Sequence, residues 1–215
     1  TLVDSQHMIV AAMSSAYEAH GMAIPPRETM LSIVGLSLVE AFTALGKGAE
    51  GYPVRSLAEG YKTAFHALRE GGAAVEPLYP GAATAIESLA RRGDVALGIA
   101  TGKSQRGVRL VLGHHGLIER FITIKTADDA PSKPDPGMLL NAMRETGAAP
   151  RDTVMIGDTS FDMQMARAAG VAAIGVDWGY HPADLLRASG AERVLSGYGE
   201  LEAALDGLLF AREIA

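Results

Sequence analysis

Two aspartates four positions apart are the clearest candidates for chemistry in the sequence. Asp158 directly follows the apolar run at 154–157, and Asp162 lies one helical turn further on. Carboxylate oxygens gathered at one mouth are the hard ligands that Mg²⁺ requires. Helix capping is the alternative, with Thr159 or Ser160 as the cap and Asp162 in the first turn. Because capping does not account for Asp158, we predict that Asp158 and Asp162 serve a metal site, with Mg²⁺ as the cofactor.

A lysine and a threonine upstream of these aspartates have the chemistry to receive an anion. Lys133 precedes a proline, which holds the lysine in an extended turn, and a helix is expected to begin after Pro136. Thr101 and Gly102 follow an apolar run and precede a helix start, where backbone N–H groups can bind an anion. Taken singly, a capping threonine and a solvated turn lysine are the simpler interpretations. Both remain candidates for phosphate binding at this point.

Short apolar runs that alternate with helical stretches are expected to position these residues. From Pro77 onward, the runs at 95–100, 121–124, 153–156 and 172–176 are rich in β-branched residues and end at glycine, proline or aspartate. This alternation predicts an α/β fold with a doubly wound, Rossmann-like parallel sheet. The ligand site of such a sheet lies at the carboxyl ends of its strands, which is where the candidate residues fall.

The first eighty residues have a different pattern. Apolar or aromatic residues at positions 9, 13, 16, 17 and 20 share one helical face that ends at Gly21. A second helical pattern follows Pro25 and Pro26, and a third runs from about residue 56 to 69. Together these patterns predict a small helical bundle.

Composition limits the classes of partner. The 215 residues carry a formal net charge of −6 and have no basic stripe, so we expect no nucleic-acid partner. No apolar run approaches the ~18 residues of a membrane span, so we expect a soluble, cytoplasmic protein with no membrane partner. Cysteine is absent, which excludes disulfides and thiolate chemistry within the sequence. The six histidines show no metal-ligand spacing and are predicted to be surface residues.

The order of the motifs resembles that of the haloacid dehalogenase (HAD) superfamily. Thr101, Lys133 and Asp158 lie 32 and 25 residues apart, as in the second, third and fourth motifs of that superfamily. The segment at 1–5, Thr-Leu-Val-Asp-Ser, resembles the tail of its first motif, Asp-x-Asp-Gly-Thr-Leu-x-Asp-Ser. Segments at 79–81, 166–170 and 175–180 look like those of the phosphoglycolate phosphatase-like branch, whose helical cap follows the first motif.

The resemblance implies a division of the chain and a role for each site residue. It implies a HAD-like α/β core at 1–5 and 77–215, with an inserted helical-bundle cap at 6–76. Thr101 would bind the transferring phosphoryl group together with Gly102, and Lys133 would stabilise the negative charge. Asp158 would bind Mg²⁺, with Asp162 supporting the metal or its waters. A small phosphorylated metabolite would be the substrate. Nothing in the sequence specifies the oligomeric state.

The resemblance also places two catalytic aspartates before the first residue of the sequence. The nucleophile would lie four positions before Thr1 and the acid/base two before it, on a central buried strand whose absence exposes the edges of its neighbours. The implied activity is Mg²⁺-dependent hydrolysis of a small phosphate monoester, such as phosphoglycolate, through an aspartyl-phosphate. Two alternatives stay open: a metal-independent dehalogenase, and a non-catalytic relative that binds a phosphorylated ligand or a protein.

Overall fold

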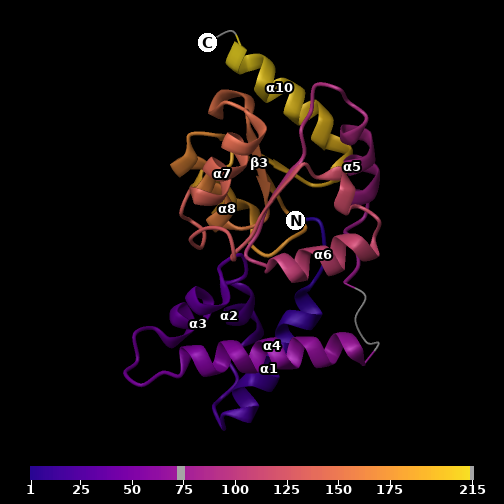
Figure 1. Ribbon diagram of the computed structural model, residues 1–215. Helices are drawn as coiled ribbons and strands as arrows, with labels where there is room; N and C mark the ends of the chain where they lie inside the picture. Colours follow the sequence, from indigo (N-terminus) through magenta and orange to yellow (C-terminus); the bar gives the residue numbers. More distant parts are fainter. Residues whose placement is uncertain (72–75, 214–215) are drawn as a thin grey trace.

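The computed structural model describes residues 1–71 and 76–213, and its first four helices pack together beside the rest of the chain (Figure 1). These helices are α1 (Gln6–Ala19), α2 (Arg27–Leu31), α3 (Leu38–Gly46) and α4 (Val54–Glu70). Phe42 and Leu57 lie fully buried at their centre. The helices predicted from periodicity are therefore confirmed, and we call residues 6–70 the helical bundle. Of the predicted cap range 6–76, residues 72–75 lie outside the described part of the chain.

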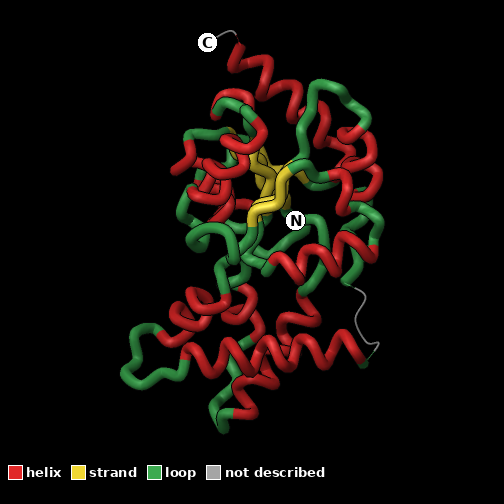
Figure 2. Tube along the Cα trace, in the orientation of Figure 1, coloured by secondary structure: helices red, strands yellow, loops and turns green. Residues whose placement is uncertain are grey.

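The remaining described residues form an α/β core in which the strands lie between helices (Figure 2). Its strands are β1 (Gly98–Ala100), β2 (Thr123–Lys125), β3 (Val154–Gly157), β4 (Ala172–Val176) and β5 (Arg193–Leu195). Its α-helices are α5 (Ala82–Ala90), α6 (Gln105–His114), α7 (Gly137–Thr146), α8 (Ser160–Ala169), α9 (Ala183–Ser189) and α10 (Leu201–Glu213). All described strand pairs are parallel, which confirms the predicted α/β class.

The two faces of β4 show how the layers are built. Ala173 packs with α7, α8 and α9 on one face, whereas Ala172 and Ile174 pack with α5 and α10 on the other. Successive side chains of a strand point to opposite faces, so a strand covered by helices on both sides must be apolar throughout. All five residues of β4 are buried. The core is thus a sheet between two helical layers.

The sheet is divided into two pieces. β1 pairs with β2, and β3 pairs with β4, which in turn pairs with β5. In the described residues no ladder joins β1 to β3. Consistent with an open edge, Val154 and Ile156 of β3 are only partly buried, unlike their partners in β4.

Three of the four predicted strands have other bounds, and a fifth strand was not predicted. The strand expected at 153–156 is Val154–Gly157. The strand expected at 95–100 begins at Gly98, although the Ile122 N–H still donates to the Leu97 carbonyl at 2.9 Å. The strand expected at 121–124 is shifted to Thr123–Lys125. β5 was not predicted, because its three residues begin with an arginine and are too few to show a strand pattern. Its pairing with β4 is a tertiary contact. No helix in the described ranges has the length and apolar character to cross a membrane.

Candidate active site

The predicted site residues meet at the carboxyl ends of β1 and β3, on the side of the core that faces the helical bundle (Figure 1). Thr101 directly follows β1, and its N–H donates at 3.0 Å to the carbonyl of Lys125, the last residue of β2. Asp158 directly follows β3, and Asp162 lies in the first turn of α8. The sequence prediction that these residues follow strands is confirmed.

Lys133 joins the two pieces of the sheet. Its side chain is 6% exposed, and its Nζ donates to the Ala100 carbonyl at 2.9 Å and to Asp162 Oδ1 at 2.6 Å. An ammonium carries three donors, so these two bonds leave one N–H for an anion. Lys133 is therefore a buried cation at the end of β1, and the interpretation as a solvated turn lysine is wrong.

Both carboxylate oxygens of Asp162 have partners within the core. While Oδ1 is paired with Lys133, Oδ2 accepts from the Thr159 N–H at 3.0 Å and from its hydroxyl at 2.8 Å, completing a capping box. A Cβ on Gly157 would lie 2.3 Å from the Asp162 Cβ, so only glycine allows this close approach. Asp162 thus caps α8 and orients Lys133, and its support of a metal stays a prediction.

Asp158 is a buried carboxylate that faces a positive charge. It is 3% exposed, and Oδ1 lies 2.6 Å from the α-ammonium of Thr1 and also accepts from the Thr1 hydroxyl. Oδ2 accepts from the Tyr180 N–H at 3.2 Å. Burial raises the pKa of the Asp158 carboxyl, but the charge and hydrogen bonds of Thr1 and the charge of Lys133 together lower the pKa below its usual range.

These residues fit Mg²⁺ as a partial ligand set. Asp158 is a buried carboxylate at the carboxyl end of β3, and carboxylate oxygens are the hard ligands that Mg²⁺ takes. In the described ranges no three acidic or histidine side chains gather as a metal cage. Mg²⁺ is commonly held by one or two carboxylates, with waters and substrate phosphates completing its shell, so a single buried aspartate is compatible with it.

Comparison with known proteins identifies the family. The haloacid dehalogenase-like hydrolase family matches residues 1–176, which is most of the chain. The chain belongs to this family. The HAD assignment made from motif order and the choice of the phosphoglycolate phosphatase-like branch are thereby confirmed.

Relatives of this HAD-like hydrolase include named phosphatases. It is 34% identical over 213 residues to the probable phosphatase IndB of Dickeya dadantii, covering 97% of this chain and 91% of that protein. It is 28% identical over 205 residues to a phosphoglycolate phosphatase of Nitrosococcus oceani, covering 94% and 91%. A hydrolase from Pseudomonas syringae of known crystal structure has a TM-score of 0.83 and 27% identity, covering 96% and 94%.

A loop of the helical bundle of this HAD-like hydrolase, residues 32–37, lies against the site. The Ser37 N–H donates to Ser132 Oγ at 2.8 Å, next to Lys133. A Cβ on Gly102 would lie 2.6 Å from the Leu36 carbonyl oxygen and 2.7 Å from that of Gly35. Gly102, predicted to bind phosphate, therefore also provides the space in which this loop rests.

His181 makes a second link between bundle and core that the sequence did not indicate. It is 6% exposed, so its placement among surface histidines was wrong. Its Nδ1 accepts from the Ser160 N–H at 2.9 Å, which leaves Nε2–H to donate to the Ser32 carbonyl at 3.1 Å. The histidine pattern was read for metal-ligand spacing, and no local signal marks a hydrogen bond to a residue 149 positions away.

Lys103, two residues after Thr101, has a partner far along the chain. Its ammonium lies 2.7 Å from the buried carboxylate of Glu76. The pairing joins residues 27 positions apart, which periodicity does not reveal.

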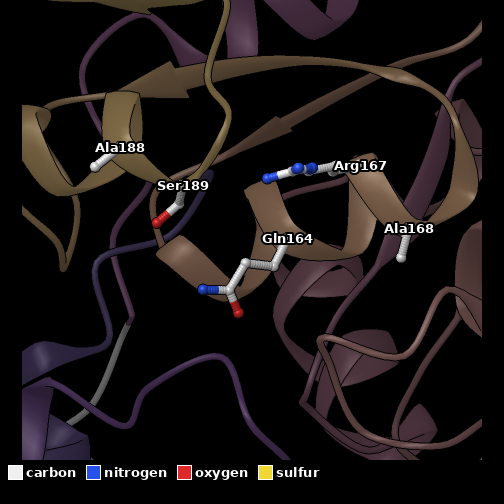
Figure 3. Close-up of a pocket in the computed structure, with 5 residues that line it drawn as sticks. All are labelled: Gln164, Arg167, Ala168, Ala188 and Ser189. Carbon is white, nitrogen blue, oxygen red and sulfur yellow. The ribbon is translucent and has the colours of Figure 1, made fainter.

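A separate pocket lies between α8 and α9 (Figure 3). It is lined by Gln164, Arg167 and Ala168 of α8 and by Ala188 and Ser189 of α9. None of these residues belongs to the predicted site, and four of the five are exposed at the surface. The pocket therefore adds nothing to the chemistry at the strand ends.

Proposed function

We propose that this chain is the greater part of a Mg²⁺-dependent phosphatase that hydrolyses a small phosphate monoester. The observation that carries the proposal is the meeting of a hydroxyl, a buried cation and a buried carboxylate at one edge of the core, in Thr101, Lys133 and Asp158. Phosphoryl transfer requires this combination, because negative charge on the phosphoryl oxygens must be neutralised in a fixed geometry. The named phosphatase relatives support the same reaction.

Each residue has a distinct part in the proposed reaction. The free N–H of Lys133 faces the phosphoryl oxygens, and the hydrogen bond to Asp162 orients the ammonium. Thr101 and Gly102 hydrogen-bond the phosphoryl group through the hydroxyl and the backbone. Asp158 would hold Mg²⁺, which when bound supplies further charge neutralisation. The loop at 32–37 excludes water and contacts the leaving group.

We further propose that the nucleophilic carboxylate belongs to residues before Thr1 in the protein. The edges of β1 and β3 are unpaired with each other, and a strand entering from the N-terminal side would lie between them. In the proposed reaction a carboxylate of that segment attacks phosphorus, the bond to the leaving oxygen breaks, and water then hydrolyses the acyl phosphate. Phosphoglycolate is the substrate we would assay first, because a relative is named for it.

The proposal is tested by assaying the full-length protein, after intact-mass spectrometry has read its N-terminal residues. Phosphate release from a panel of small monoesters is measured with Mg²⁺ and with EDTA. Asp158→Asn should lower kcat/KM by about a hundredfold or more and raise the Mg²⁺ concentration needed for half-maximal rate. Asp152→Asn is the matched control, because Asp152 lies just before β3 with a side chain that is 59% exposed.

Two outcomes would contradict the proposal. Phosphate release that EDTA leaves intact would exclude the metal, and halide release from haloacids under EDTA would favour the dehalogenase instead. The N-terminal segment could also lack an aspartate at the predicted position. If the protein then binds phosphorylated ligands without turnover, the non-catalytic relative is favoured.

A further inference from the structure

The two chain segments that cross between the helical bundle and the core run side by side. The Asp4 N–H donates to the Pro77 carbonyl at 2.8 Å, and the Tyr79 N–H donates to the Leu2 carbonyl at 2.9 Å. An antiparallel bridge between Val3 and Leu78 completes the pairing. Residues 2–5 and 76–79, which we call the crossing segments, therefore form one hydrogen-bonded unit.

Glu76 lies where the crossing segments meet the bundle. It is 4% exposed, and its Oε1 accepts from Ser5 Oγ and from Lys103 Nζ, the latter at 2.7 Å. Its Oε2 accepts from the guanidinium of Arg69 near the end of α4. One carboxylate thus joins both crossing segments to the bundle and to the loop that follows β1.

The charges around Glu76 keep it ionised. Burial by itself raises the pKa of Glu76, but the charge of Lys103 and hydrogen bonds from Lys103, Ser5 and Arg69 lower it to about 2. The same two cations lie over the ring of Phe65, at 4.8 Å for Arg69 and 5.6 Å for Lys103. Removing the carboxylate would leave two cations together without a counter-charge, which is costly in a partly buried place.

Lys103 connects this cluster to the segment at 101–103, which is proposed to bind phosphate. Its ammonium is held by Glu76 and Ser5, while its backbone N–H donates to Thr101 Oγ1 at 3.2 Å. Its carbonyl accepts from the Ala127 N–H at 3.2 Å. Lys103 therefore connects the crossing segments to the segment at 101–103 through both its side chain and its backbone.

We propose that Glu76 is a positioning residue that couples the posture of the helical bundle to the placement of Thr101 for phosphate binding. The inference rests on the proposed function for the identity of the anion. Coupling of this kind is reciprocal: a bundle posture that aligns Thr101 strengthens phosphate binding, and bound phosphate favours that posture.

The kinetic test compares Glu76→Gln with Glu70→Gln in the full-length protein. Glu70 ends α4 with a side chain that is 71% exposed and pairs only with His66 among the described ion pairs, so it is a matched control. Glu76→Gln should raise KM about tenfold with a smaller change in kcat, and Glu70→Gln should match wild type. Lys103→Met should give the same rise, and the double variant should add nothing further, because both residues act through one contact.

A second measurement reports the posture without turnover. Because the sequence contains no cysteine, spin labels can be placed at Thr43→Cys on α3 and Arg109→Cys on α6, both exposed positions. In wild type, inorganic phosphate with Mg²⁺ should shift the distance distribution between the labels toward one narrow population. In Glu76→Gln the distribution should be broad and insensitive to phosphate. If this variant does not fold, Lys103→Met is measured in its place, with the same expectation.

The outcomes separate this inference from the proposed function. A KM and a distance distribution in Glu76→Gln that equal those of Glu70→Gln would overturn the inference, as would lower thermal stability with an unchanged KM. Wild-type protein that responds to phosphate but releases none from any monoester would reject the proposed function and retain the coupling. Turnover in wild type, together with an unaltered KM and distance distribution in Glu76→Gln, would retain the proposed function and reject the coupling.

Discussion

The loops after β3 and β1 both supply site residues, but they are held in different ways. After β3, Asp158, Thr159 and Asp162 are each at most 3% exposed, and Thr159 and Asp162 are bonded to each other. After β1, Thr101 and Gly102 are only half-buried, and Gly102 lies against the loop of the helical bundle. The β3 side is therefore the more buried and the more completely hydrogen-bonded side, whereas the β1 side is half-buried and lies against the loop at 32–37. His181 joins the same loop to the start of α8.

The two sides suit different tasks in a phosphatase site. Charged groups that must stay in place belong on the rigid side, where burial and complete hydrogen bonding restrict them. Groups that must admit and release substrate belong on the side that the bundle can move. Lys133 is the bridge, since its ammonium contacts the end of β1 and the start of α8.

The largest effect is expected from breaking that bridge. Lys133→Met leaves the buried Asp162 carboxylate without its cation, which should lower the free energy of unfolding by about 4 kcal/mol in urea titrations. Lys62→Met is the control, because Lys62 is 57% exposed in an i,i+3 pair with Glu59 and should cost less than about 1 kcal/mol. Similar losses in the two variants would show that the two sides are not joined through Lys133.

A smaller effect should distinguish the strands themselves. Ile156 of β3 and Ile174 of β4 are register partners, but Ile174 is fully buried and Ile156 only partly. In the 215-residue chain, Ile174→Ala should lower the free energy of unfolding by about 3 kcal/mol, and Ile156→Ala by about half of that. In the full-length protein, where the proposed strand would lie beside β3, the two losses should be equal, and a smaller loss for Ile156→Ala there would contradict that strand.

The smallest effect is expected on the β1 side, in kinetics more than in stability. The methyl group of Gly102→Ala would overlap the carbonyl oxygens of Gly35 and Leu36 and displace the loop. We expect KM to rise about tenfold, since overpacking costs of order 1–3 kcal/mol. Gly113→Ala in α6 is the control, because a Cβ there meets nothing within 4 Å. An unchanged KM in Gly102→Ala would mean that the loop does not rest on Gly102 during catalysis.

Much of the site could be predicted from the order of local patterns. An apolar run followed by a polar residue identifies the end of a strand, and parallel strands bring their carboxyl ends to one edge. That reasoning placed Thr101 after β1 and Asp158 after β3, as the structure has them. It also identified the helices of the bundle, since the spacing of apolar residues along a helix is a property of the local sequence.

The partners of the charged residues were decided only by the tertiary structure. Asp162 was predicted at a metal and is paired with Lys133, 29 positions away, and Lys103 is paired with Glu76, 27 positions away. Glu76 and His181 carried no signal at all in the sequence. Spacing along the chain fixes which residues share a strand end or a helical face, because backbone geometry is local. Which carboxylate meets which cation depends on how the crossovers and the bundle pack, and that packing is not contained in any single segment.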